Sequence, residues 1–98
     1  MDIRLIKAPS EGTLQIIEKR SNLKFDGFRP GAVGLVQGKI IEMICAADVA
    51  EKCVGVKVSD IRGSCPQNFV LLAIVGELSE VEEALQTIKN RSEVNLRW

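Results

Sequence analysis

Seven consecutive apolar residues, from Phe69 to Val75, form the longest apolar run of the chain, and Gly76 ends it. Short runs rich in valine, isoleucine and phenylalanine are typical of β-strands that lie in a protein core. A helix that crosses a bilayer needs about 20 apolar residues, so this run is far too short to span a membrane. The run therefore predicts a core strand.

The rest of the chain divides into short strand-like segments and two helical segments. The turn-rich stretch from Ser21 to Gly31 connects two of the strands. Further strands are expected over Ile3–Lys7, Ala32–Val36 and Val54–Val58, and helices over Lys39–Cys53 and from Leu78 onward. Thr13–Ile17 is either a short strand or a helical turn, and its threonine and two isoleucines favour the strand. The order β-β-β-α-β-β-α predicts an α+β sandwich, an antiparallel sheet with helices on one face.

Both expected helices show apolar residues at three- and four-residue spacing. The first begins after Gly38, and its apolar face is expected to hold Ile40, Met43, Ile44, Ala47 and Ala50. In the second, Ser79 and Glu82 have the spacing of a capping box at the N-terminus. Its apolar stripe is expected to hold Val81, Ala84, Leu85 and Ile88.

Composition excludes several classes of function. With 98 residues, 46% of them apolar, the chain is expected to form a single domain. Thirteen basic and thirteen acidic residues cancel, so no overall charge draws it to nucleic acid or to a membrane. No signal peptide is visible and the cysteine count is odd, which favours a reduced cytoplasmic compartment. The chain has no histidine, so a Ser-His nucleophilic site is not expected and the chain is not interpreted as an enzyme.

The run Gly63-Ser64-Cys65-Pro66-Gln67 places a cysteine in a turn between two strand-like segments. Glycine permits a positive φ and proline fixes φ, so the loop is expected to be short and tightly specified. By itself, one such cysteine is more often a free thiol than a metal ligand. Cys45 and Cys53 lie eight residues apart in the first expected helix and are interpreted as small core residues.

Three segments in this order resemble bacterial microcompartment shell proteins. Gly31 to Val36 resembles the first core strand of that family. Cys45-Ala46-Ala47-Asp48-Val49-Ala50-Glu51-Lys52-Cys53 resembles its first helix, which typically reads Glu-Ala-Ala-Asp-x-x-x-Lys-Ala. Val75 to Ala84 resembles the entry to its second helix, and the likeness extends from about Gly31 to Asn90.

About thirty residues precede this core, a layout that resembles the circularly permuted members of the family. The resemblance implies a single permuted domain over residues 1–98, with a core over 31–90 and a tail over 91–98. Within residues 1–30, Ile3–Lys7 would be the strand moved from the C-terminus. Thr13–Ile17 would match the segment that joins copies into a small barrel over the pore in some permuted members.

The family assembles as flat hexagonal tiles, so the resemblance implies a homohexamer that packs with other shell proteins around encapsulated enzymes in the bacterial cytoplasm. Lys52 falls on the helix lysine at the edge of the tile. The loop from Arg62 to Gln67 falls on the segment around the central pore. Its Gly-Ser-Cys-Pro-Gln run resembles the variant in shell proteins of glycyl-radical-enzyme microcompartments, for which iron–sulfur binding at the pore is the expectation.

Six-fold assembly would bring six Cys65 thiols to one axis. A [4Fe–4S] cluster has three-fold but no six-fold symmetry, so three thiolates would bind it and its fourth iron would face along the axis. Backbone N–H groups of Gly63, Ser64 and Gln67 would donate to cluster sulfurs, and Pro66 would stiffen the turn. The cluster would be shared between subunits and serve electron transfer or cluster passage across the shell.

The leading interpretation is a non-catalytic shell subunit whose pore binds this cluster. Two other classes stay open at the level of sequence. One is an oligomeric regulatory domain that senses a small ligand, since α+β sandwiches of this size are used in that way. The other is a haem or redox sensor that uses Cys65-Pro66, with the thiolate as an axial ligand.

Overall fold

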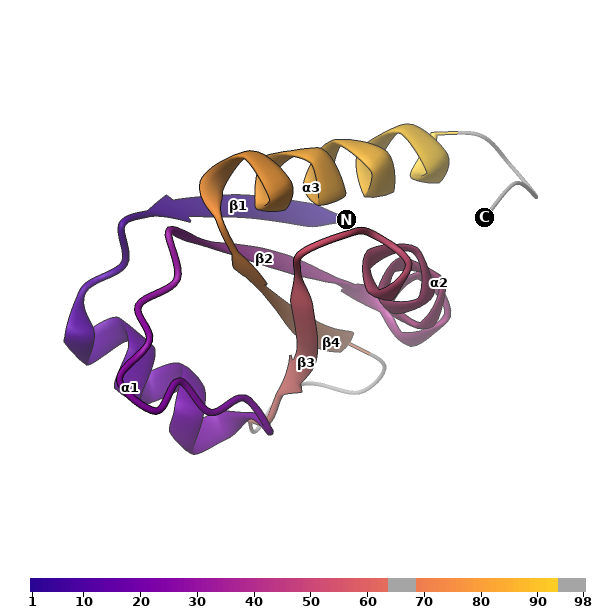
Figure 1. Ribbon diagram of the computed structural model, residues 1–98. Helices are drawn as coiled ribbons and strands as arrows, with labels where there is room; N and C mark the ends of the chain where they lie inside the picture. The colour runs from indigo at the N-terminus through magenta and orange to yellow at the C-terminus, as the bar shows by residue number, and fades with distance from the viewer. Residues whose placement is uncertain (64–68, 94–98) are drawn as a thin grey trace.

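The computed structural model describes residues 1–63 and 69–93. A four-stranded antiparallel sheet forms its centre, in the order β1-β2-β4-β3 (Figure 1). The strands are β1 (Asp2–Lys7), β2 (Ala32–Lys39), β3 (Lys57–Ile61) and β4 (Phe69–Gly76), and the helices are α1 (Glu11–Arg20), α2 (Ile40–Glu51) and α3 (Leu78–Ser92). The expected α+β class and antiparallel sheet are confirmed.

The core strand expected over Phe69–Val75 is β4, and its position explains its composition. It pairs with β2 on one side and β3 on the other. Successive side chains of a strand point to opposite faces. Leu72 and Ile74 accordingly join the core on one face, and Ala73 and Val75 join the core on the other. A strand buried on both faces has no polar side to show, so its sequence is a continuous apolar run.

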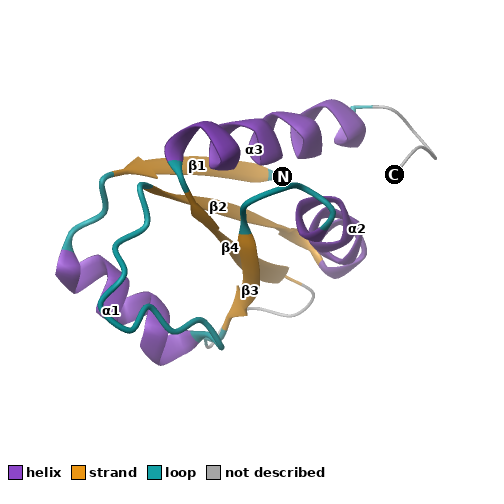
Figure 2. Ribbon diagram, viewed as in Figure 1, coloured by secondary structure: helices purple, strands orange, loops and turns teal. Residues whose placement is uncertain are grey.

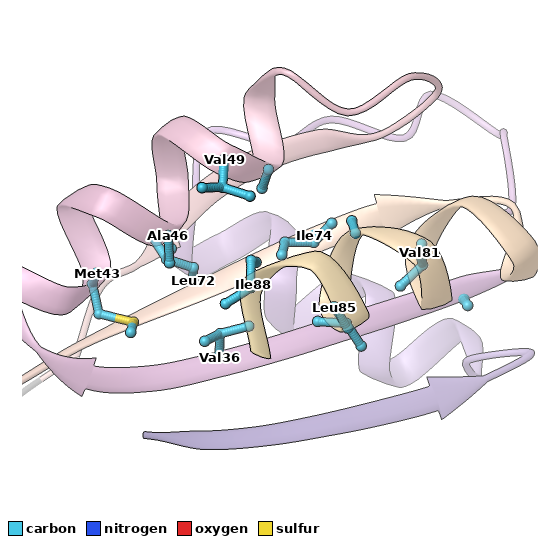
Figure 3. Packing of buried hydrophobic residues seen from close by; sticks show 12 residues of the cluster. Val36, Met43, Ala46, Val49, Leu72, Ile74, Val81, Leu85 and Ile88 are labelled. Carbon is cyan, nitrogen blue, oxygen red and sulfur yellow. The ribbon is translucent and has the colours of Figure 1, made fainter. Parts of the chain in front are cut away.

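Helices α2 and α3 cover one face of the sheet (Figure 3). The apolar stripe expected on α3 is buried, with Val81 and Ile88 fully enclosed. Leu85 lies against Gly34 of β2, where an added Cβ would come within 2.8 Å of its Cδ2. Close contact between helix and sheet therefore depends on glycine at this strand position.

The third helix, α1, lies on the other face of the sheet, which corrects the expectation that all helices share one face (Figure 2). Its buried Leu14 and Ile17 meet Val33 and Val75 across a second core. Leu23 and Phe25, from the connection that follows α1, complete this core. The sheet is thus the middle layer of three.

The strand expected over Thr13–Ile17 is wrong, because these residues belong to α1. Ser10 is the N-cap of the helix, and its Oγ accepts a hydrogen bond from the Thr13 N–H at 3.2 Å. Leu14 and Ile17 are three residues apart, so both face the sheet. The barrel segment proposed from the resemblance at these residues is therefore helical in this chain.

The expected helix over Lys39–Cys53 is α2, which begins at Ile40 and ends at Glu51. Its buried face differs from the expected one, since Ile40 and Ile44 are exposed. The face toward the sheet consists of Met43, Ala46, Val49 and Ala50. The helix is apolar on both sides, so spacing alone does not select which side packs on the sheet.

Two boundaries also differ from expectation. The capping box expected at Ser79 and Glu82 is absent, because the N-cap of α3 is Glu77, two residues before Ser79. The strand expected over Val54–Val58 begins only at Lys57, since Gly55 adopts a φ of 81° in the connection after α2. Ile3–Lys7 is confirmed as a strand within β1, and Ala32–Val36 within β2.

Candidate functional site

The hairpin of β3 and β4 carries the loop that the sequence singled out. Ile61 ends β3 and pairs with Leu71, and β4 begins at Phe69. Gly63 is exposed. Ser64, Cys65, Pro66 and Gln67 lie outside the described residues. The structure therefore fixes the two strands from which this loop extends.

Arg62 ties the start of this loop to the C-terminal end of α1. Its backbone N–H donates to the Arg20 carbonyl at 2.6 Å, and its Nη2 donates to the Lys19 carbonyl at 3.2 Å. Arg20 returns a bond from Nη1 to the Arg62 carbonyl at 3.2 Å. A guanidinium beside the last carbonyls of a helix satisfies acceptors that have no partner within the helix. Nothing in the sequence indicates that Arg62 contacts α1.

The two described cysteines take no part in a shared site. Cys53 Sγ donates to the Val49 carbonyl at 3.3 Å, and both Cys45 and Cys53 are partly buried. Within residues 1–63 and 69–93, no three His, Cys, Asp or Glu side chains gather as metal ligands would. The described donors of a single chain therefore do not fit a metal cluster.

Lys52 follows the last residue of α2 and is exposed. Its Nζ lies 2.8 Å from the Asp48 Oδ2, one turn earlier. An exposed pair at this spacing stabilises a helix by only about 0.3–0.5 kcal/mol. The lysine stem and charge are therefore displayed at the surface beside the end of the helix.

The outer side of α2 is an exposed apolar surface formed by Ile40, Ile41 and Ile44. Ile41 is 74% exposed and Ile44 is 67% exposed. A helix that is apolar all round is normally buried on all sides. We name these three isoleucines the α2 outer face. The sequence signal that reveals it is the presence of two apolar sides on one helix.

No helix in the described part of the chain is both long and apolar enough to cross a bilayer.

A family model matches most of this chain, and two solved structures are similar to it in both sequence and fold. The family model described as the BMC domain matches residues 32–96. The ligand-free structure of the GrpU microcompartment shell protein from Clostridiales bacterium 1_7_47FAA is 44% identical, with a TM-score of 0.77, covering 96% of this chain and 94% of that chain. The ligand-free GrpU microcompartment shell protein from Pectobacterium wasabiae is 30% identical, with a TM-score of 0.72, covering 90% and 99%. A search of curated proteins found no match.

Proposed function

Because this chain belongs to the BMC domain family, we propose that it is a structural, non-catalytic subunit of a bacterial microcompartment shell in the bacterial cytoplasm. The observation that carries the proposal is the similarity along nearly the whole chain, at 44% identity over 96% of its length, to a protein described as a microcompartment shell protein. The similarity includes β1 and α1, which lie outside the range of the family model.

Assembly into a homohexameric tile is the finer part of this proposal. The molecule is flat, with extents of 40 × 31 × 18 Å. The α2 outer face leaves three isoleucines without cover in the single chain, and burying such a surface between copies is favourable. Lys52, exposed at the end of the same helix, would lie at the tile edge and meet neighbouring tiles. The partners are further copies, other shell proteins and encapsulated enzymes.

Molar mass by light scattering tests the assembly, with about six subunits expected. Ile44→Lys places a charge on the α2 outer face and should lower the mass to that of the monomer, with the helical circular dichroism retained. Glu83→Lys is the matched control, because Glu83 is exposed on α3, away from that face. It should leave the mass unchanged. A stable monomeric wild type, or an Ile44→Lys variant that keeps the full mass, would contradict the proposal.

We also propose that the family core is circularly permuted in this chain. The family model begins at Ala32, yet β1 pairs with β2 along its whole length, from Asp2 with Gln37 to Lys7 with Ala32. Met1 and Glu93 line the same groove, so the start of β1 and the end of α3 are neighbours. Both observations support a strand that followed α3 in an ancestral order and now precedes the core.

We further propose that the pore binds an iron–sulfur cluster, which requires assembly of the hexamer. Cys65 from several subunits would bind the cluster, since the described residues of one chain hold no metal-binding group. The family resemblance of the Gly63–Gln67 run supports a [4Fe–4S] cluster, which supplies one-electron transfer when bound. Backbone N–H groups of Gly63, Ser64 and Gln67 would donate to cluster sulfurs, with Pro66 stiffening the turn. The contacts of Arg62 with α1 support a loop whose starting point is fixed.

Anaerobic reconstitution with iron and sulfide counts tests the cluster. Cys65→Ser should lose iron and sulfide and keep the hexameric mass. Cys45→Ala and Cys53→Ala are matched controls that should keep both, with stability lowered by about 1 kcal/mol at partly buried positions. Retention of iron by Cys65→Ser, or a sharp haem Soret band in the wild type, would refute the assignment.

A further inference from the structure

A groove of about 690 Å³ lies between β1 and α3, on the face of the sheet that α2 and α3 cover. Its apolar lining consists of Met1, Ile3, Leu5 and Leu85. The groove is open to solvent, and Met1 is 42% exposed. The helix layer thus leaves part of the apolar face of β1 uncovered.

The position of α3 explains why this groove exists. β1 is an edge strand of the sheet. Leu85 of α3 lies over Gly34 of the neighbouring strand β2 rather than over β1. Ile3 and Leu5 point toward the helix face and pack against its core, but both stay only partly buried. Half-covered apolar side chains beside an edge strand are a surface that proteins commonly cover with another segment.

The described part of α3 and the residue after it lead the chain to the rim of this groove. Glu93, the last residue that the structure describes, lines the groove. The sequence continues Val94-Asn95-Leu96-Arg97-Trp98, with apolar residues at every second position. Such alternation gives an extended segment one apolar side.

The length of this segment fits the groove. Five extended residues reach about 16 Å. α3 lines the groove from Glu82 to Ser92, a length of about 15 Å at the helical rise. The segment is therefore long enough to return along the part of α3 that borders the groove.

The charges of the groove also match the segment. Glu42, Glu82 and Glu93 line it, against a single lysine, Lys89. Arg97 is the only charged side chain of the segment. An arginine is well suited to pair with carboxylates at such a rim.

We propose that residues 94–98 bind in the β1–α3 groove of their own chain. The apolar side chains cover Ile3 and Leu5, and Arg97 meets the acidic rim. This inference does not depend on the hexamer or on the iron–sulfur cluster.

Tryptophan fluorescence of the full chain tests the proposal, because Trp98 is its single tryptophan. A tryptophan in an apolar groove should emit at shorter wavelength and resist quenching by acrylamide. Ile3→Lys should move the emission to longer wavelength and increase quenching. Ile6→Lys is the matched control, since Ile6 lies on the same strand but packs in the core on the other face, with α1. It should leave Trp98 unchanged if the variant is folded by circular dichroism.

A charge exchange provides an independent test that leaves the core intact. Arg97→Glu should increase quenching of Trp98, and adding Glu82→Arg should restore protection. Three results would overturn the proposal. They are a solvent-exposed Trp98 in the wild type, equal responses of the Ile3→Lys and Ile6→Lys variants, and protection that disappears on dilution. The last result would assign the groove to the segment of another copy.

Discussion

At the scale of single residues, Gly76 shows how closely the described elements approach one another. It ends β4, and an added Cβ would lie 2.6 Å from the backbone carbonyl oxygen of Gly55. Because that obstacle is backbone, it moves aside less easily than a side chain would. We expect Gly76→Ala to lower the free energy of unfolding by about 1–3 kcal/mol, the usual cost of overpacking. Urea denaturation followed by circular dichroism measures this change.

Gly12 is the matched control for Gly76. It lies in the first turn of α1, and an added Cβ there would meet nothing within 4 Å. Alanine is a better helix former than glycine, so Gly12→Ala should raise the free energy of unfolding by up to about 1 kcal/mol. Equal effects of the two substitutions would contradict the close approach between Gly76 and the Gly55 carbonyl oxygen.

At the scale of elements, the N-caps of α1 and α3 in the structure differ from what the sequence predicts. Ser10 caps α1 through its hydrogen bond to Thr13, whereas Ser79 lies inside α3 and is exposed. We expect Ser10→Ala to destabilise the protein by about 1 kcal/mol. Ser79→Ala should stay within about 0.5 kcal/mol of the wild type, as a surface substitution does. Thermal unfolding of the two variants compares them directly, and the reverse order would favour the capping box expected from the sequence.

The elements that the sequence predicted well are those whose pattern admits one interpretation. β4 is apolar throughout, and α3 has a single apolar stripe, so both were located correctly. Thr13–Ile17 is short and β-branched, which favours a strand, but the cap at Ser10 and the second core select a helix. On α2 the two apolar sides made the choice of buried face arbitrary.

The candidate site was predictable only in part. Cys65 stands out in the sequence, but the partners that it would need come from other chains, which no pattern within one chain can show. The anchoring of Arg62 on α1 links residues 42 positions apart, and the α1 that receives it was itself interpreted as a strand. Long-range contacts of this kind follow from packing rather than from local pattern.

At the scale of the whole molecule, the order of the elements is separable from their arrangement. The start of β1 and the last turn of α3 lie at the same end of the molecule (Figure 1). A chain reopened at the Asp26–Gly27 turn, with residues 98 and 1 joined by a short glycine-serine linker, keeps every helix and strand. We expect it to fold, with the circular dichroism and molar mass of the wild type, because termini that lie close together tolerate permutation.

A second permutant serves as the control. It uses the same linker but opens the chain between Val36 and Gln37, inside β2, where both strand neighbours are paired. This variant should fail to unfold cooperatively. If the Asp26–Gly27 permutant also failed, the proposed evolutionary relocation of β1 would lose its structural support.

The three-layer arrangement has a consequence for topology in an assembled shell. Met1 and Glu93 border the groove on the α3 side of the sheet, whereas Asp26 and Gly27 lie beside α1 on the opposite side. In a tile of the proposed kind, a protease site fused before Met1 would therefore face one side, and a site inserted at the Asp26–Gly27 turn would face the other. Protease added outside intact shells should cleave only one of these two sites. The site that stays uncleaved identifies the side of the tile that faces the lumen.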